Sequence, residues 1–213
     1  MAIIDNHKEV KIDRLFTDKH SEMFAFFDTQ DIDVEVSDDF ESFQAFLEGL
    51  SDEDYPYNYD MTFNGVVVDG FNLRLIKDNN IIATYAAKWK DVIQMQNDFI
   101  DYFQEDDLLQ SPILPIFEGK QLYSSCQWVS KDYRGNKFGM ILDHLKKNIC
   151  FDIFEADIQY AMHKEPLKDY HINNLHYSDS QWLGTIPNGE VYNVAWITKE
   201  TWTDKLNDIR KLY

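Results

Sequence analysis

The stretch LYSSCQWVSKDYRGNKFGMILDHLKKNIC, residues 122–150, decides the fold of this chain. It begins as a predicted strand, passes through a turn that carries Arg134, Gly135 and Gly139, and continues as a predicted amphipathic helix. Apolar residues recur at helical spacing on one face of that helix: Phe138, Ile141, Leu142, Leu145 and Ile149. A strand that leads through a glycine-bearing turn into a helix is suited to holding phosphate. The first amides of a helix have no partner within it, and the helix dipole favours an anion there.

The segment from Val129 to Gly139, VSKDYRGNKFG, resembles the acetyl-CoA loop of the GNAT superfamily of N-acyltransferases. That loop follows the pattern V-x-x-x-x-[RQ]-x-x-G-x-[GA]. The segment matches it without a gap at Val129, Arg134 and Gly139, and departs from it at Lys137, where the pattern has glycine. A tight strand–helix turn with a surface arginine is the alternative, because glycine-containing turns alone are weak signals.

The resemblance implies a cofactor site for acetyl-CoA, or for another acyl-CoA, where the strand at 121–130 separates from the next strand. It places the diphosphate on the turn, at Arg134, Gly135, Asn136, Lys137, Phe138 and Gly139. Backbone groups near Gln127, Trp128 and Val129 would hold the pantetheine arm and polarise the thioester carbonyl. Lys131 would lie near the diphosphate. Lys146 or Lys147 would reach the nucleotide phosphate, or else only complement the helix dipole.

The resemblance also suggests catalytic residues on the helix after the fifth strand. Many relatives carry a tyrosine there, in a segment that ends Y-x-x-x-G-F. Aligning residues 175–177, LHY, with that ending puts Ile172 at the tyrosine position. We therefore expect Tyr170 or His171 to serve in proton transfer, with a solvent-facing side chain as the alternative for His171. The strand at 121–130 carries no carboxylate for a base, and Cys126 is expected to be a buried core thiol.

Composition predicts one globular domain over residues 1–213, because 44% of the residues are hydrophobic and 15% are aromatic. No apolar run is long enough to cross a bilayer, and the N-terminal residues do not resemble a secretory signal. The two cysteines, Cys126 and Cys150, are typical of buried thiols in a reducing compartment, so we expect a cytoplasmic protein. The six histidines show no metal-ligand spacing, and the Walker, H-E-x-x-H, paired-cysteine and G-x-S-x-G motifs are absent.

The charge distribution constrains the partners. A net charge of −18 argues against a protein that grips DNA or an anionic membrane. Residues 1–60 hold 17 acidic and 4 basic residues, a net of −13, whereas residues 119–150 hold 2 acidic and 6 basic residues, a net of +4. A basic region on the predicted phosphate turn suits an anionic cofactor, and the acidic region suits a cationic acceptor. A solvated acidic face is the alternative.

The expected fold class is α/β (α+β). It is a GNAT-like mixed, mostly antiparallel sheet of about six to seven strands flanked by helices. Strands are predicted at 9–16, 71–76, 81–88, 122–130, 151–162, 182–185 and 190–197. Helices are predicted at 18–27, 39–47, 91–103, 138–150, 166–174 and 201–213. Residues 77–80 form the turn between the second and third of these strands. The segment 90–120 is a helical insertion, expected to cap a sheet edge, to meet a partner or oligomer copy, or to complete the core.

Two functions fit these patterns. The first is an N-acetyltransferase that moves an acetyl group directly from acetyl-CoA to a primary amine, such as a polyamine, a lysine side chain or an aminoglycoside-like molecule. The alternative is a GNAT-fold protein without catalysis, serving as a binding or structural module in a larger assembly such as a phage particle. Lys137, Ile172 and the insertion motivate the alternative. A nucleic-acid mimic is a third and poorer fit, because of the aromatic content and the acyltransferase-like turn.

Overall fold

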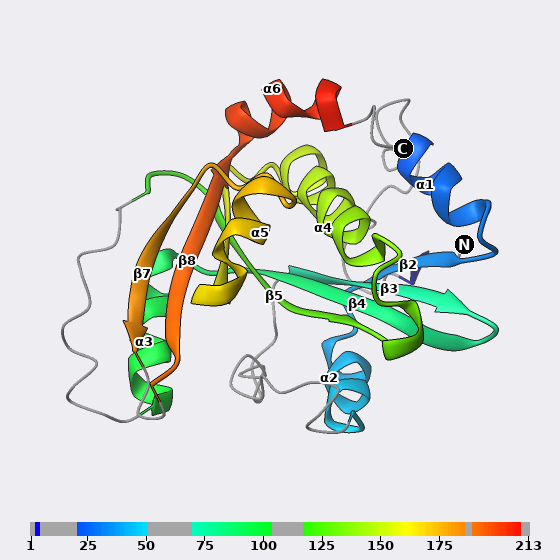
Figure 1. The fold of residues 1–213 in the computed structure, drawn as a ribbon, viewed down its shortest axis with the longest axis horizontal. Helices are drawn as coiled ribbons and strands as arrows, with labels where there is room; N and C mark the ends of the chain where they lie inside the picture. The colour runs from blue at the N-terminus through cyan, green and yellow to red at the C-terminus, as the bar shows by residue number, and fades with distance from the viewer. Residues whose placement is uncertain (1–2, 5–20, 51–69, 104–116, 186–188, 210–213) are drawn as a thin grey trace.

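The structure is a computed structural model, and it describes residues 3–4, 21–50, 70–103, 117–185 and 189–209. Its strands are β1 (Ile3–Ile4), β2 (Asp33–Ser37), β3 (Gly70–Lys77), β4 (Asn80–Trp89), β5 (Gln121–Val129), β6 (Ile158–Lys164), β7 (Asp179–Thr185) and β8 (Val191–Thr198). Its α-helices are α1 (Ser21–Asp28), α2 (Phe40–Glu48), α3 (Val92–Phe103), α4 (Phe138–Asn148), α5 (Lys168–Asn173) and α6 (Lys199–Ile209). Figure 1 shows their arrangement.

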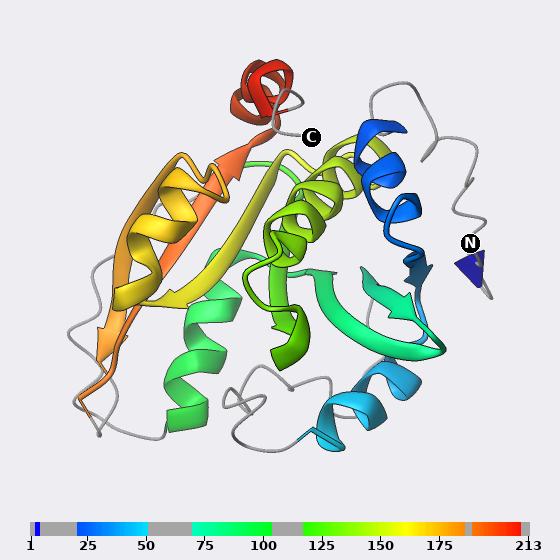
Figure 2. The same cartoon turned by 45° about the vertical axis from the view of Figure 1, so that its right-hand side comes forward.

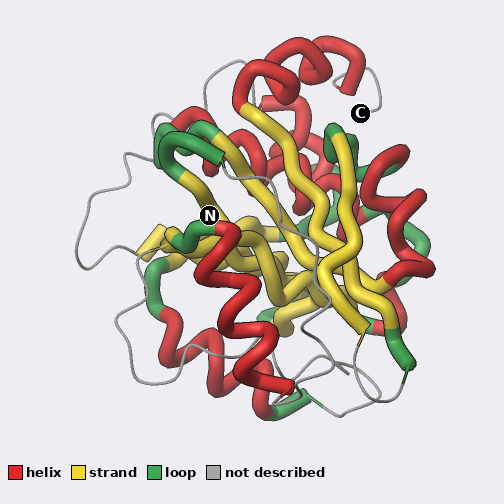
Figure 3. The backbone as a smooth tube through the Cα atoms, turned by 90° about the vertical axis from the view of Figure 1, so that its left-hand side faces the viewer, coloured by secondary structure: helices red, strands yellow, loops and turns green. Residues whose placement is uncertain are grey.

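The strands of the described residues form one mixed sheet of eight strands in the order β1-β2-β3-β4-β5-β6-β8-β7. Neighbouring strands are antiparallel except at two junctions, β1 with β2 and β5 with β6. Helices lie on both sides of the strands (Figure 3). The expected fold class, a mostly antiparallel mixed sheet flanked by helices, is confirmed, with eight strands in the described part of the chain where six to seven were expected.

The hairpin of β3 and β4 is the clearest local prediction that the structure confirms. Asp78 and Asn79 at its tip have positive φ angles of 51° and 61°, the left-handed conformation that a two-residue hairpin turn requires. Asp and Asn tolerate that conformation better than other side chains. The turn therefore sets the register in which β3 pairs with β4, with Lys77 opposite Asn80.

The N-terminal part differs from the prediction. Strand β2, of sequence DVEVS, lies between α1 and α2, whereas the sequence indicated two helices in succession. The strand predicted at 9–16 falls outside the described residues. Asp39 caps α2 as expected, since its carboxylate accepts a hydrogen bond of 2.9 Å from the amide of Ser42. Because β2 intervenes, α1 and α2 pack on opposite faces of the sheet.

One face of the sheet carries the largest core. Helices α1, α4 and α6 contribute buried residues there, including Phe27, Leu142 and Trp202. Phe40, Phe43 and Leu47 of α2 pack on the other face, in a cluster with Cys126 and Trp128 of β5. Helix α3, from the insertion, packs on that same other face through Val92 and Met95, against Tyr123 and Tyr160 among others. The described part of the insertion thus completes the core, and it covers a face of the sheet rather than an edge.

The segment after α4 also corrects a prediction. Residues 151–157 are not strand. Ile149–Ile153 continue the helix as a π-helical turn, and β6 begins at Ile158. The apolar residues of the run FDIF pack against the main core here, since Phe151 is buried and Ile153 and Phe154 are partly buried against it. Both cysteines are free and buried as expected, and burial raises the pKa of the Cys150 thiol to about 12. Among the described helices, none has the length and apolarity to cross a bilayer.

Candidate functional site

The parallel strands β5 and β6 pair over only part of their length. Their register runs from Gln121 opposite Ile158 to Ser124 opposite Ala161. Both strands continue beyond that point, to Val129 and Lys164, without pairing to each other. The strands therefore separate after Ser124 and Ala161, and Figure 2 shows them diverging. We call the gap between residues 125–129 and 162–164 the wedge, and the last pair, Ser124 and Ala161, its apex.

A β-bulge lies on the β5 side of the wedge. Cys126 has a positive φ of 58°, and the β4–β5 register shifts there. The carbonyl of Cys126 accepts a hydrogen bond of 3.1 Å from the Thr84 hydroxyl. One extra residue reverses the alternation of side chains along the strand. After the bulge Gln127 faces α4 and Trp128 faces α2. The bulge therefore changes the orientation of residues 127–129, the segment predicted to hold the pantetheine arm, relative to the preceding part of β5.

The turn after β5 is open to solvent. A 3-10 helix, Lys131–Tyr133, leads to Gly135 at a φ of 85° and to Lys137, which is the N-cap of α4 at a φ of 64°. The side chains from Arg134 to Lys137 are exposed. Within the described residues, no hydrogen bond engages the backbone amides from Gly135 to Gly139. Phe138 is buried and Gly139 is half-buried, so the exposed part of the turn is residues 134–137, where the Lys137 side chain extends into solvent.

Two contacts hold the turn against β5. The Arg134 guanidinium donates a hydrogen bond of 2.9 Å from Nε to the carbonyl of Val129. Gln127 donates from Nε2 to the carbonyl of Gly139, at 2.8 Å. A Cβ at Gly139 would lie 3.1 Å from Gln127 Nε2, closer than most Cβ contacts, and 3.4 Å from Val129 Cγ2. Gly139 therefore lets α4 approach β5 without displacing the Gln127 side chain, whereas the space beside Gly135 is open.

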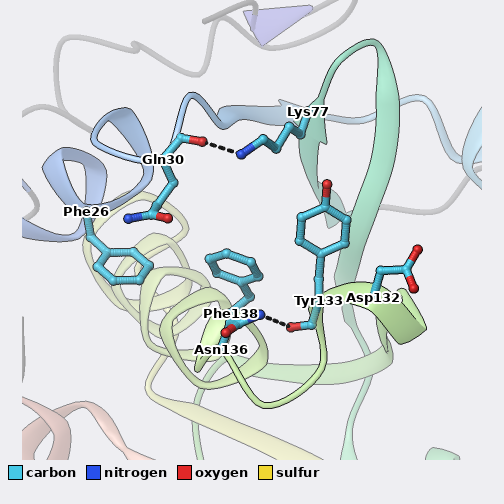
Figure 4. A pocket seen from close by; sticks show the side chains of 7 residues that line it. All are labelled: Phe26, Gln30, Lys77, Asp132, Tyr133, Asn136 and Phe138. Carbon is cyan, nitrogen blue, oxygen red and sulfur yellow. Dashed lines mark hydrogen bonds between the residues drawn. The ribbon is translucent and has the colours of Figure 1, made fainter.

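A pocket of about 360 Å³ lies on one side of this turn, between the C-terminal end of α1, the β3–β4 turn and the β5–α4 turn (Figure 4). Seven residues line it: Phe26, Gln30, Lys77, Asp132, Tyr133, Asn136 and Phe138. Lys77 donates a hydrogen bond of 2.8 Å to the carbonyl of Gln30, which ties the β3–β4 turn to the end of α1. Of the predicted cofactor residues, Asn136 and Phe138 line this pocket.

Tyr170 and His171, the predicted catalytic pair, have different surroundings. Tyr170 is 38% exposed, and burial of its remaining surface raises the pKa of its phenol. His171 is 6% exposed, so the solvent-facing alternative is wrong. Its ring stacks on His163 of β6, with centroids 4.4 Å apart. Burial, and then the charge of His163, lower the pKa of His171 to about 3, so it is a neutral imidazole at pH 7.

The expectation that Lys146 or Lys147 reaches a nucleotide phosphate is wrong. Both side chains are fully buried, together with Asp143 one turn earlier on α4. Asp143 accepts from Lys146 at 2.8 Å and also pairs with Lys147. Lys147 donates to the carbonyl of Leu175 at 2.7 Å. Burial lowers the pKa of Lys147 to about 7, against the opposing effect of Asp143.

Sequence reasoning missed this buried lysine cluster of Asp143, Lys146 and Lys147. The i, i+3 and i, i+4 spacing was visible in the sequence, but such spacing is typical of exposed ion pairs on a helix surface. A second missed feature is Trp128, 8% exposed, whose indole Nε1 has no hydrogen-bond partner within the described part of the chain. Buried donors are normally paired, so an N–H without a partner among the described residues is an exception on the α2 face of β5. No cluster of metal-ligating residues occurs among the described residues.

The free energy of unfolding is expected to decrease as the pH falls from about 6.5 to about 3, because His144 and His171 are buried as neutral imidazoles. Burial lowers the pKa of each from 6.5 to about 3. In this window the unfolded chain binds protons that the folded chain does not, at about 1.4 kcal/mol per pH unit for each group. Urea unfolding between about pH 4 and pH 7 measures the slope. The variant His171→Leu should reduce this slope by the contribution of one proton, about 1.4 kcal/mol per pH unit. An unchanged slope would contradict the assignment of His171 as a buried neutral imidazole.

No family model and no curated protein sequence matches the sequence of this chain. BjaI, a CoA-dependent acyl-homoserine lactone synthase solved with SAM and isopentyl-CoA, is similar in structure. Its TM-score is 0.52 at 13% identity, over 81% of this chain and 82% of BjaI.

Two further solved structures are similar to this chain. A second BjaI structure, with MTA, has a TM-score of 0.50 at 14% identity, over 96% of this chain and 87% of that chain. A candidate acetyltransferase has a TM-score of 0.51 at 11% identity, over 85% of this chain and 91% of that chain. At such identities the likeness establishes the fold alone. The fold of this chain is the GNAT fold that the segment from Val129 to Gly139 predicted.

Proposed function

We propose that this protein is an N-acyltransferase that transfers an acyl group directly from acyl-CoA to a primary amine. One observation carries the proposal: β5, bulged at Cys126, separates from β6 before an exposed turn at residues 134–137, and no hydrogen bond among the described residues engages the amides from Gly135 to Gly139 at the N-terminus of α4. A wedge between two strands suits an extended arm, and free amides at a helix start suit a diphosphate. The fold alone would not imply this activity, since one fold hosts many functions.

The residues of the turn and the wedge fit acyl-CoA. The amides from Gly135 to Gly139 would hold the diphosphate, with Lys131 and Lys137 as exposed cations beside it. The backbone of Gln127, Trp128 and Val129 would hold the pantetheine arm. The bound thioester supplies an activated acyl group, and preorganised amides on β5 would polarise its carbonyl. BjaI, which was solved with isopentyl-CoA, supports an acyl-CoA in general; we propose acetyl-CoA for this chain.

Proton transfer and acceptor choice complete the proposal. Tyr170 is the better candidate for protonating the thiolate, because it is partly exposed and its raised pKa keeps it protonated, whereas His171 is buried. For the acceptor we propose a cationic amine. The support is the net charge of −13 over residues 1–60, together with the BjaI structure that holds SAM, a molecule with both an amine and a sulfonium cation.

Two glycine substitutions test the cofactor site. Gly135 and Gly189 have nearly equal φ angles of 85° and 86°, and a Cβ at either meets nothing within 4 Å. Gly135→Ala and Gly189→Ala should therefore each lower the free energy of unfolding by about 1 kcal/mol. Only Gly135→Ala places a methyl group beside the proposed diphosphate. In calorimetric titrations with acetyl-CoA, we expect at least a tenfold (~1.4 kcal/mol) higher Kd for Gly135→Ala and an unchanged Kd for Gly189→Ala.

A GNAT-fold binding module without catalysis is the second candidate. It is favoured by the burial of His171, by Ile172 at the position where relatives carry tyrosine, and by a non-glycine residue, Lys137, in the left-handed conformation. Acetyl-CoA hydrolysis and transfer to an amine panel separate the two candidates. Binding with turnover supports the enzyme, binding without turnover supports the module, and no binding at millimolar acetyl-CoA contradicts the cofactor site.

A further inference from the structure

A hydrogen-bonded network lies beneath the apex of the wedge, on the face of the sheet that carries α4. Gln159 of β6 donates from Nε2 to the Ser124 hydroxyl and to the Tyr177 hydroxyl, both at 2.8 Å. Ser124 belongs to the last pair that joins β5 to β6. Gln159 therefore links the two strands, through their side chains, at the point where their backbone pairing ends.

The buried lysine cluster joins this network from α4. Lys146 donates to the Tyr177 hydroxyl at 3.3 Å, and its ammonium lies 4.1 Å from the ring centroid of Tyr85. The ammonium of Lys147 lies 4.0 Å from the ring centroid of Tyr177 and bonds the carbonyl of Leu175. The lysines thus fasten the segment 175–177, which follows α5, to α4, and Gln159 fastens Tyr177 to the sheet at the apex. We call the whole set the apex network: Ser124, Asp143, Lys146, Lys147, Gln159 and Tyr177.

A gain in the stability of the fold does not explain why the charged residues of the apex network are buried. It contains two ammonium groups and one carboxylate, all fully buried. Removing charges from water costs several kcal/mol per ion, and well-packed apolar side chains of similar volume are often as stable or more stable. With one carboxylate for two lysines, Lys146 and Lys147 must share Asp143 as their partner of opposite charge. Polar geometry, rather than burial energy, is what these residues supply: Lys146 and Gln159 make directional bonds to one hydroxyl, that of Tyr177.

We propose that the apex network is a positioning device that fixes where β5 and β6 separate, and so sets the width of the wedge for the acyl-CoA arm. This inference rests on the proposed function. Gln159 and Tyr177 act through the strands and need no contact with the cofactor. A wedge that closes by one further strand pair, or opens by one, would displace the backbone of residues 125–129. Displacements of about 1 Å in a site are enough to lower rates by about a hundredfold.

The variant Tyr177→Phe tests this inference because it removes one oxygen atom, the one that accepts from both Lys146 and Gln159. Tyr160→Phe is the matched control. Tyr160 is also fully buried, on the α3 side of β6, and its hydroxyl donates to the carbonyl of Lys90 at 2.8 Å. We expect similar decreases in melting temperature for both variants. Calorimetry with acetyl-CoA should give a Kd at least about tenfold higher for Tyr177→Phe and within about twofold of wild type for Tyr160→Phe.

Gln159→Met is measured alongside, since it removes the link to Ser124 and leaves the lysines in place. If Tyr177→Phe fails to fold, the same rise in Kd in Gln159→Met supports the inference. Equal affinities in wild type, the control and the folded apex variants overturn it and leave the proposed function intact. If wild type itself does not bind acetyl-CoA, the proposed function is overturned, and this inference with it.

Discussion

Asp143→Ala is expected to lower the free energy of unfolding by about 3–5 kcal/mol, the usual cost of leaving a buried charge without its partner. Asp143 is the carboxylate of the buried lysine cluster and pairs with both Lys146 and Lys147. Without it, each lysine must either hold its charge in a closed interior or release its proton. Urea unfolding followed by circular dichroism measures the change. Asp204→Ala, at an exposed position on α6, is the control and should change stability by less than about 0.5 kcal/mol.

A triple substitution completes this test. Asp143→Leu, Lys146→Met and Lys147→Met together remove all three charges and keep similar side-chain volumes. We expect stability equal to wild type, or higher by about 1–4 kcal/mol. A single Asp143→Ala variant as stable as Asp204→Ala would show that the lysines do not depend on this carboxylate. A triple variant as unstable as Asp143→Ala would show that the cluster serves stability.

Gly139→Val is expected to weaken acetyl-CoA binding by at least about a hundredfold, the largest effect at the proposed cofactor site. A valine Cβ would lie 3.1 Å from Gln127 Nε2 and 3.4 Å from Val129 Cγ2, and its two methyl groups need still more room. The first turn of α4 must then move away from β5, which displaces the amides proposed to hold the diphosphate. Overpacking of this kind also costs about 1–3 kcal/mol of stability.

Met140→Val is the matched control for Gly139→Val. It places the same β-branched residue at the next position of α4, where the side chain is half-buried against the core. Calorimetry should show near wild-type affinity for Met140→Val. Equal affinities for the two valine variants would mean that the α4–β5 contact does not position the binding amides.

Local features could be predicted from the sequence where one segment determines its own geometry. The β3–β4 turn follows from Asp78 and Asn79, which tolerate positive φ, and the start of α4 follows from the glycine-bearing turn. Strand β2 was missed because it is only five residues long and lies between two apolar helices. The π-helical turn at 149–153 was missed because a short apolar run such as FDIF suits a strand or a buried helix equally.

The candidate site was predictable only in its backbone part. Residues 127–139 lie together on one strand and turn, so a local pattern could identify them. The burial of Lys146 and Lys147 depends on Tyr85 and Tyr177, which are distant in sequence, so a helix-end lysine pair could not be distinguished from a solvated one. The burial of His171 against His163 likewise depends on how α5 packs on β6. Such tertiary contacts leave no trace in the periodicity of either segment.

The most direct test of the central claim is a titration of the ¹⁵N-labelled protein with acetyl-CoA, followed by amide ¹H–¹⁵N correlation spectra. The amides from Gly135 to Gly139 should shift most, together with those of Gln127, Trp128 and Val129. The amide of Gly189, in the β7–β8 turn, should not move. Saturable shifts in that pattern are the expected result. No shift at millimolar acetyl-CoA, or shifts that leave the turn between β5 and α4 unaffected, would contradict the account.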